Sequence, residues 1–433
     1  MKSTKLALLL SIVLLFGNSS QSAEGSKFSS NQQNKDLRNL LKKDIEAGSL
    51  KTTAIPQCST TNLRYFIPFS YPLETHKVTT EDGYILTLFR LQSKGSMLSG
   101  KPVVFLQHGL FNDANSWLMN GEKNGLGFIL ANAGFDVWMG NNRGTKYSRI
   151  HKTYTTSDPE FWDFSFDEFA EYDLPANLAY ISLSTGTKKI RYIGHSQGTS
   201  QMFAALSDPK IRPKVAPYIA VYYALAPIVF LDKTLISSIQ YLAYWRRLLA
   251  DALISSGGRA LLIGTCIWDQ ASINYWNGYC RLYPTECYSK VAYEDLNPAV
   301  DNWPRTGYHN QLGESGTSFN CLLHYAQMIR VQEKNPYSFP KFDYGSAAAN
   351  MKKYGQATPP QYDLSLIREK VRLWVGSKDM LATLPEAKRI LSVISQNTDA
   401  SMVLLDQWGH ETFHFAADNT AQYSRLVNEL KAI

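Results

Sequence analysis

Residues 194–198 read Gly-His-Ser-Gln-Gly, a G-x-S-x-G pattern in which a serine hydroxyl serves as a nucleophile. The apolar run Lys189–Ile193 comes before it, and the stretch Thr199–Leu206 after it favours a helix. A sharp turn from a strand into a helix needs this arrangement, because the glycines let the chain turn tightly and the turn exposes the serine Oγ. The sequence therefore predicts Ser196 as the nucleophile of an acyl-transfer reaction.

A serine nucleophile of this kind needs a base and an acid, which follow it along the chain in the order acid, then histidine. Asp379 comes just after the apolar run Val371–Val375, and His410 follows the run Met402–Leu405. We expect His410 to accept the Ser196 proton and Asp379 to hold the imidazole in the right tautomer. Residues of the same types with weaker sequence context remain as alternatives: Asp343, Asp363, Asp399, His309, His324 and His414.

Two main-chain N–H groups are expected to stabilise the oxyanion. One is that of Gln197, at the start of the helix after the nucleophile, where the helix dipole is positive. The other is that of Leu110, because His108-Gly109-Leu110 follows the apolar run Val103–Leu106. His108 precedes the nucleophile in the chain, so we interpret it as a structural histidine at the end of a strand.

Residues 410–414 read His-Glu-Thr-Phe-His and so also match H-E-x-x-H, a zinc-peptidase pattern in which Glu411 would be the general base. Three observations disfavour this alternative. The preceding strand and Gly409 place His410 in a loop or at a helix start, Glu429 is the only late candidate for a third ligand, and Ser196 and Asp379 would have no role. We therefore predict neither a metal nor a cofactor.

Short apolar runs alternate with helical stretches from about residue 59, which indicates an α/β fold with a mostly parallel sheet covered by helices on both faces. Residues 228–345 interrupt this rhythm with a helical, aromatic stretch and four of the five cysteines. We interpret them as a mainly helical cap inserted between two parts of the core, residues 58–227 and 346–433.

The N-terminus predicts secretion. Residues 1–23 contain Lys2 and Lys5, the short apolar run Leu6–Phe16 and small residues near a cleavage point, as in a signal peptide. Residues 24–57 are polar and read as a leader or pro-segment. No later stretch is long and apolar enough to span a membrane, so we expect the mature protein in an extracellular or endolysosomal lumen.

Charge and cysteine content bear on the binding partner and on disulfide formation. The chain has 433 residues and a net charge of +7, but no basic block that would indicate nucleic-acid binding. The odd number of cysteines leaves at least one thiol unpaired in a monomer. In an oxidising compartment one or two disulfides are expected, and Cys280 with Cys287 would close a short loop.

Several longer motifs resemble the acid lipase family, which contains the gastric and lysosomal acid lipases. The resemblance extends from about residue 57 to the C-terminus, and its most specific blocks are Ser-Phe-Asp-Glu-Phe at 165–169 and Tyr-Asp-Leu-Pro-Ala at 172–176. It implies an α/β-hydrolase core with a lid over an apolar cleft. It also implies a triad of Ser196, Asp379 and His410, with Leu110 and Gln197 as oxyanion donors.

The same resemblance implies hydrolysis of triacylglycerols or steryl esters, often in acid. Because lipid esters form aggregates, we expect the enzyme to act at the surface of a membrane, droplet or micelle. The segment Ile236–Leu249, with Arg246 and Arg247, has the composition to insert apolar groups into such a surface. Glu411-Thr412 departs from the usual residues after the histidine, and the cap cysteines and lid diverge too. An esterase or acyltransferase acting on smaller esters is the alternative function.

Overall fold

The computed structural model describes residues 63–92, 100–235, 243, 260–261, 297, 299–302 and 315–433. The expected signal peptide, the leader and nearly all of the segment Ile236–Leu249 lie outside this set. His309 and the cysteines other than Cys321 lie outside it as well. Cys321 is a buried free thiol, which confirms the prediction of at least one unpaired cysteine. Burial raises its pKa to about 12.

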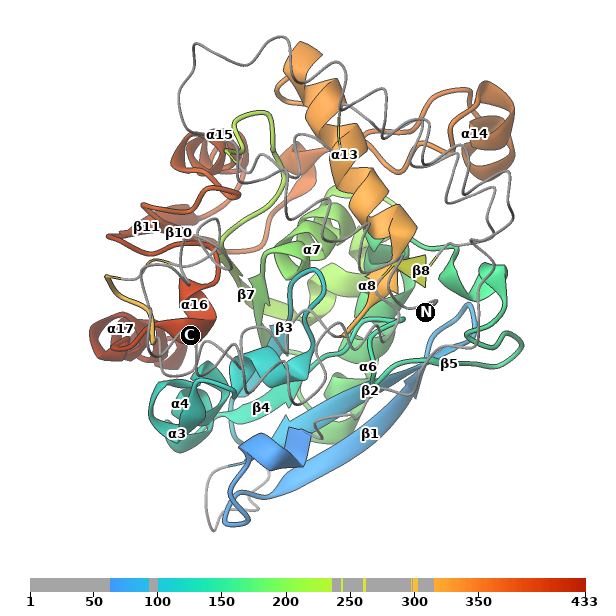
Figure 1. Cartoon of the computed structure of the whole chain (residues 1–433). Helices are drawn as coiled ribbons and strands as arrows, with labels where there is room; N and C mark the ends of the chain where they lie inside the picture. The colour runs from blue at the N-terminus through green and yellow to red at the C-terminus, as the bar shows by residue number, and fades with distance from the viewer. Residues whose placement is uncertain are drawn as a thin grey trace, which may run out of the picture.

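Within the described residues, nine strands form one sheet, whose main path runs in the order β1-β2-β4-β3-β6-β7-β10-β11 (Figure 1). Strands β1 and β2 pair antiparallel, β2 pairs antiparallel with β4 and β5, and the rest of the sheet is parallel. The strands are β1 (Leu73–Thr79), β2 (Tyr84–Leu91), β3 (Val103–Gln107), β4 (Asp136–Met139), β5 (Ile150–His151), β6 (Ile190–His195), β7 (Ile219–Leu225), β10 (Val371–Gly376) and β11 (Ala400–Leu405). A separate antiparallel pair joins β8 (Ala260–Leu261) to β9 (Thr317–Ser318).

The burial of each strand follows from its place in the sheet. All residues of β3, β4 and β6 are buried, because helices cover both faces of a parallel sheet and so demand apolar side chains on both sides. The edge strand β11 is buried at only two of its six positions. The predicted mostly parallel sheet is therefore confirmed.

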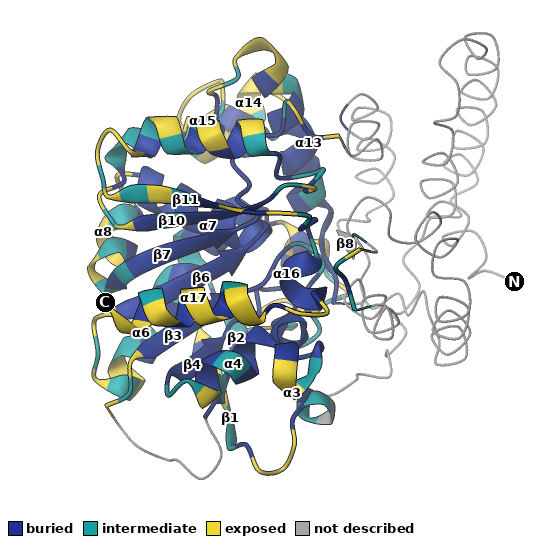
Figure 2. Ribbon diagram, turned by 90° about the vertical axis from the view of Figure 1, so that its left-hand side faces the viewer, coloured by how far each residue is buried: buried dark blue, intermediate teal, exposed yellow. Residues whose placement is uncertain are grey.

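Helices cover the sheet on both faces, and Figure 2 shows buried strands between helices whose outer surfaces are exposed. Helix α17 packs with α4, whereas α6 packs with α7. None of the described helices combines the length and apolar character needed to cross a bilayer. The α-helices are α3 (Gly121–Asn124), α4 (Leu126–Asn132), α5 (Phe166–Glu168), α6 (Leu174–Thr185), α7 (Gln197–Ser207), α8 (Arg212–Val215), α13 (Phe319–Lys334), α14 (Ala347–Tyr354), α15 (Leu384–Ile394), α16 (Thr412–Phe415) and α17 (Thr420–Lys431).

The two parts of the predicted core build one sheet, because β10 from the second part pairs with β7 from the first. The β10 to β11 pair then adds the last strand. In parallel strands all carboxyl ends meet at one edge of the sheet, so the loops after β3, β6, β10 and β11 converge there. These four loops contain the predicted site residues.

Candidate active site

Ser196 lies at a sharp turn between β6 and α7, as the sequence predicts. Its φ is +52°, in the left-handed region, and α7 begins at the next residue. Gly194 and Gly198 are required here by close approach: a Cβ on Gly194 would meet the Gly198 carbonyl, and a Cβ on Gly198 would collide with the Gln107 carbonyl. The turn therefore sets the serine at the helix N-terminus, next to the loop that follows β3.

His410 and Asp379 complete a chain of hydrogen bonds that begins at Ser196. The Ser196 Oγ lies 2.9 Å from His410 Nε2, and His410 Nδ1 lies 3.0 Å from Asp379 Oδ2 and 3.2 Å from Oδ1. All three residues are buried. Folding thus brings together three side chains that are 214 and 31 positions apart in the sequence.

The loops that contain the acid and the histidine are bonded to each other. Lys378 donates its backbone N–H to the Trp408 carbonyl at 2.9 Å, and Ser377 donates to the Leu405 carbonyl at 2.9 Å. A Cβ on Gly376 would collide with the Trp408 carbonyl, so glycine lets the two loops approach. Because β10 and β11 are neighbours in register, these contacts fix Asp379 and His410 relative to one another.

Asp379 is held as a carboxylate. Burial on its own would raise its pKa, but the neighbouring His410 and backbone N–H donors outweigh burial and hold the pKa below the ordinary value. The donors are Leu381, at 2.9 Å, and Ala382, at 2.7 Å, and both bond to Oδ1. Oδ2 is the oxygen nearer to His410 Nδ1.

The expected oxyanion donors, the N–H groups of Leu110 and Gln197, lie on the loop after β3 and at the first residue of α7. Neither donates a hydrogen bond to another described residue. Gly109 brings the two segments together, since a Cβ there would lie 3.0 Å from the Ser196 Cβ. Both N–H groups are therefore available near the serine.

His108 has the structural role that the sequence predicts. Its Nδ1–H donates to the Gly109 carbonyl at 2.7 Å, and its Nε2 accepts from the Asn142 N–H at 3.1 Å. The Asn142 side chain bonds in turn to Gln107 and Gln201, which lie on β3 and α7. This network fixes the loop after β3 against the helix that follows Ser196.

His195 supports the site in a way that sequence reasoning missed. Its Nε2 lies 2.9 Å from the His410 carbonyl oxygen, which fixes the backbone of His410, whereas Asp379 holds the ring. Burial lowers the pKa of His195 to about 3, and the neighbouring His410 adds to the shift, so the ring stays neutral. Only the position next to Ser196 marks this residue in the sequence.

The alternative histidines lie elsewhere. His414 is on α16 with its ring against Trp117, at 4.8 Å between centroids. His324 stacks on Phe166 at 3.9 Å and bonds to the Pro340 carbonyl. Since His410 faces Ser196 and Asp379, it does not pair with His414 in the way that the zinc-peptidase pattern requires.

The alternative acids make local contacts away from His410. Asp343 accepts from the Gly345 N–H, Asp363 caps a turn through the Ser365 N–H, and Asp399 pairs with Arg372.

Another acid, Asp301, joins the site through Thr412. Asp301 Oδ2 accepts from the Thr412 Oγ1 at 3.2 Å and from the Asn297 N–H, and Thr412 Oγ1 in turn accepts from the Gly409 N–H. Burial raises the pKa of Asp301 to about 7, although these hydrogen bonds oppose the shift. The folded chain thus keeps a proton on Asp301 that the unfolded chain has already released at pH 5 to 6.

We expect the stability contributed by Asp301 to be greatest in acid and to fall as pH rises toward about 7. Each unit of pH in that window costs about 1.4 kcal/mol of unfolding free energy. Asp301→Asn, whose amide oxygen can keep both hydrogen bonds, should flatten the decline. Thermal unfolding from pH 4 to 8 measures this, with the exposed Asp363→Asn as control. Equal slopes for wild type and Asp301→Asn would contradict the assignment.

The chain that leads into the predicted cap starts beside Asp379. The Leu235 N–H donates to the Met380 carbonyl at 2.7 Å, and the Leu235 side chain is 62% exposed. Residue 235 is the last of the continuous range that the structure describes before residue 243. Leu235 itself is therefore held against the loop that contains Asp379.

Comparison with known proteins shows the fold and the family of the chain. Residues 64–121 match the profile described as partial alpha/beta-hydrolase lipase region, and residues 102–258 match the alpha/beta hydrolase fold. The chain is 35% identical over 401 residues to the lysosomal acid lipase/cholesteryl ester hydrolase of Macaca fascicularis, covering 89% of this chain and 94% of that one. It is 36% identical over 336 residues to the gastric triacylglycerol lipase of Bos taurus (76% and 80%), and 34% identical over 399 residues to lipase member M of Mus musculus (90% and 91%). With this identity along nearly its whole length and a serine turn at the carboxyl edge of its sheet, the chain belongs to the acid lipase family of α/β-hydrolases.

Proposed function

We propose that the protein is a serine lipase in which Ser196, His410 and Asp379 form the catalytic triad. The observation that carries the proposal is the continuous set of contacts from Ser196 Oγ to His410 Nε2, 2.9 Å, and from His410 Nδ1 to Asp379 Oδ2, 3.0 Å. This is the geometry that a nucleophile, a general base and an orienting carboxylate need.

In the proposed mechanism, Ser196 Oγ attacks the ester carbonyl carbon while its proton passes to His410 Nε2. The imidazolium is stabilised by Asp379 and gives that proton to the departing alcohol oxygen, which leaves an acyl group on Ser196. Water then attacks the acyl carbon, losing a proton to His410, and the same imidazole returns the proton to Ser196 as the carboxylic acid leaves.

The charge that develops on the carbonyl oxygen is met by the N–H groups of Leu110 and Gln197 in this proposal. Their freedom from other described acceptors supports the assignment, as does the start of α7 at Gln197. Donors that are fixed before the reaction need no reorganisation, and losing one typically costs about 3 kcal/mol of transition-state stabilisation.

The substrates that we propose are lipid esters, triacylglycerols or steryl esters. The names of the macaque and bovine relatives, a cholesteryl ester hydrolase and a triacylglycerol lipase, support this class. The same relatives support a lysosomal or secreted location. Hydrolysis of small soluble esters, or acyl transfer to an alcohol, is the alternative.

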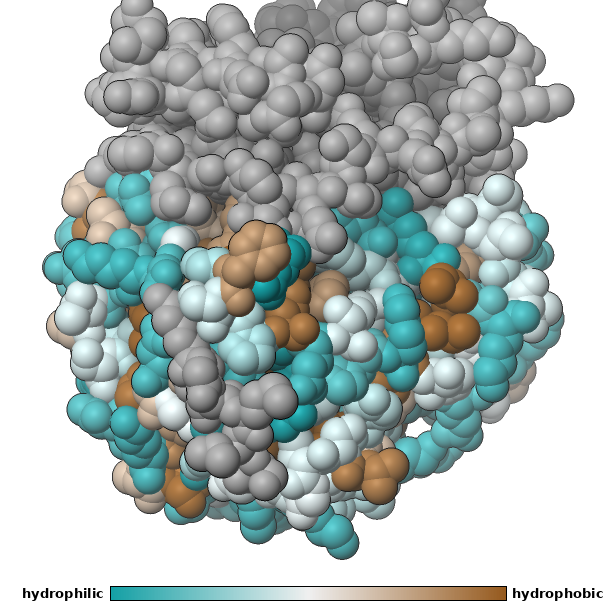
Figure 3. Space-filling view, turned by 90° about the horizontal axis from the view of Figure 1, so that it is seen from below, coloured by the Kyte–Doolittle hydropathy of each residue, from teal (hydrophilic) through white to brown (hydrophobic). Residues whose placement is uncertain are grey.

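Contact with a lipid surface remains part of the proposal. The described part of the face in Figure 3 mixes hydrophilic and hydrophobic side chains, with hydrophobic patches that are small and separated. The apolar and basic composition of Ile236–Leu249 supports interface binding by the proposed cap, residues 228–345. The proposed domain division has three further parts. They are a signal peptide (residues 1–23), a leader (24–57) and a core formed by residues 58–227 together with 346–433.

A substrate panel tests the function. We expect release of oleate from emulsified triolein or cholesteryl oleate to exceed hydrolysis of p-nitrophenyl butyrate per unit of enzyme at some pH between 4 and 8. The physical reason is that the proposed cap would bring the active site to the surface of aggregated lipid. Activity confined to the short soluble ester, with none on either emulsion, would favour the esterase alternative.

A further inference from the structure

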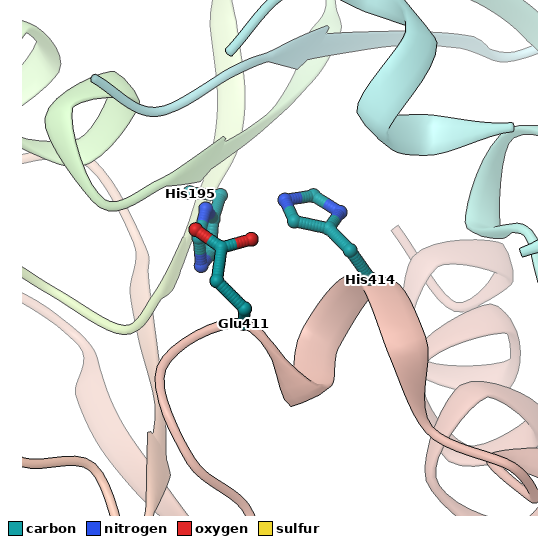
Figure 4. Close-up of side chains that lie close together, drawn as sticks. All are labelled: His195, Glu411 and His414. Atoms are coloured by element: carbon teal, nitrogen blue, oxygen red, sulfur yellow. The ribbon is translucent and has the colours of Figure 1, made fainter. Parts of the chain in front are cut away.

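Three side chains that transfer no proton in the proposed mechanism lie together near the His410 backbone. They are His195 on β6, Glu411 just before α16, and His414 within α16. One ligand atom from each lies within 4.8 Å of the others, and Figure 4 shows the Glu411 carboxylate beside the two rings. We propose that His195, Glu411 and His414 bind one divalent transition-metal ion, with Zn²⁺ as the ion that this donor set fits best.

The hydrogen bond of His195 leaves its Nδ1 able to bind a metal ion. A carbonyl oxygen only accepts, so the contact from Nε2 to the His410 carbonyl, 2.9 Å, places the ring proton on Nε2. Nδ1 therefore carries a bare lone pair. This nitrogen is fully buried and has no hydrogen-bond partner among the described residues. Metal-binding histidines commonly have this arrangement, with the other ring nitrogen donating to a backbone carbonyl.

The local fold brings the other two ligands to the same place. Glu411 and His414 are separated by less than one helical turn, and α16 begins between them. The His414 ring meets the His195 ring edge-on at 4.4 Å between centroids and also contacts Trp117. His195 and His414 are buried, and although Glu411 as a whole is half-buried, its Oε2 is a buried atom, so the ligand atoms lie in a largely enclosed place beside Trp117.

Two imidazoles and one carboxylate are a known donor set for zinc, with a water in the fourth position. Bonds of 2.0 to 2.2 Å in a tetrahedron place ligand atoms about 3.4 Å apart. The three ligand atoms lie within 4.8 Å of one another, so metal binding requires each pair to approach by at most about 1.4 Å. One carboxylate against a divalent ion reduces the net charge of the site to +1.

This site differs from the one that the H-E-x-x-H pattern suggests. There His410 and His414 would be the ligands, but His410 is bonded to Ser196 and Asp379. His195, 215 positions before His410, takes its place. The proposed ion holds α16 to β6 and takes no part in ester cleavage, so the inference does not depend on the proposed function.

The experiment uses the full chain after dialysis against a chelator. We expect one equivalent of Co²⁺ to give the visible absorption of a low-symmetry, four- or five-coordinate site, and excess Zn²⁺ to abolish that signal. Zn²⁺ at about 100 times its Kd should raise Tm by roughly 3 °C for a chain of this length. Glu411→Gln should weaken binding at least tenfold, and His414→Phe, which fills the space beside Trp117, should remove it.

His151→Gln, at a half-buried histidine outside the cluster, is the matched control and should bind like wild type. Ester hydrolysis and circular dichroism report whether each variant has folded, and the dialysed wild type should retain its activity. The proposal is overturned if folded wild type gives no Co²⁺ spectrum and no Tm shift. It is overturned equally if Glu411→Gln and wild type have the same Co²⁺ spectrum and affinity.

Discussion

Replacement of Ser196 by alanine is expected to lower kcat for ester hydrolysis by about 10⁶-fold, because the acyl-enzyme then has no oxygen on which to form. The Ser196 Oγ is the atom that faces His410 Nε2 at 2.9 Å. Initial rates on triolein and labelling by a fluorophosphonate measure the loss, and both should vanish together.

Ser207→Ala is the matched control, since Ser207 lies at the other end of α7 and its buried Oγ has no hydrogen-bond partner among the described residues. It should retain wild-type activity and labelling. A Ser196→Ala protein that still hydrolyses ester, or a probe attached to another residue of the inactivated enzyme, would rule out the proposed nucleophile.

Asp379→Asn should lower kcat by about 10⁴-fold with little change in fold. The Leu381 and Ala382 N–H groups both donate to Oδ1, so the asparagine oxygen will stay there and its NH₂ group will face His410 Nδ1. That NH₂ group is a donor, so Nδ1 must become the acceptor and the ring proton must move to Nε2. A protonated Nε2 cannot take the proton from Ser196.

Steady-state kinetics and the rate of fluorophosphonate labelling both measure this effect, since labelling also needs the activated hydroxyl. Asp399→Asn is the control, because Asp399 pairs with Arg372 at the surface and is expected to leave kcat unchanged. A loss of less than tenfold in Asp379→Asn, with normal labelling, would assign the acid role to another residue.

The parts of the site that lie within one turn of chain could be predicted from the sequence. A strand, a tight glycine turn and a helix follow one another from β6 to α7, so Ser196 is marked by local pattern alone. The predicted helix from Thr199 begins two residues earlier in the structure, at Gln197, because the turn itself starts the helix. Asp379 and His410 were predictable because parallel strands bring their carboxyl ends to one edge.

Contacts between distant segments were not predictable in the same way. The pattern at 410–414 suggested that His410 and His414 could act together, whereas in the structure His414 meets His195 instead. The spacing of residues in the sequence does not predict that contact, since it depends on how α16 packs against the end of β6. Asp301 was missed for the same reason: its contact with Thr412 joins residues 111 positions apart.

The backbone at Ser196 has a consequence for how this turn is maintained. At a φ of +52° every residue with a Cβ is conformationally strained, by roughly 1 to 3 kcal/mol, and glycine is not. Selection for thermodynamic stability alone would thus replace this serine by glycine. A serine at this position therefore indicates that its hydroxyl is needed for the reaction. The rest of the α/β core must supply the folding free energy that offsets the strain at this residue.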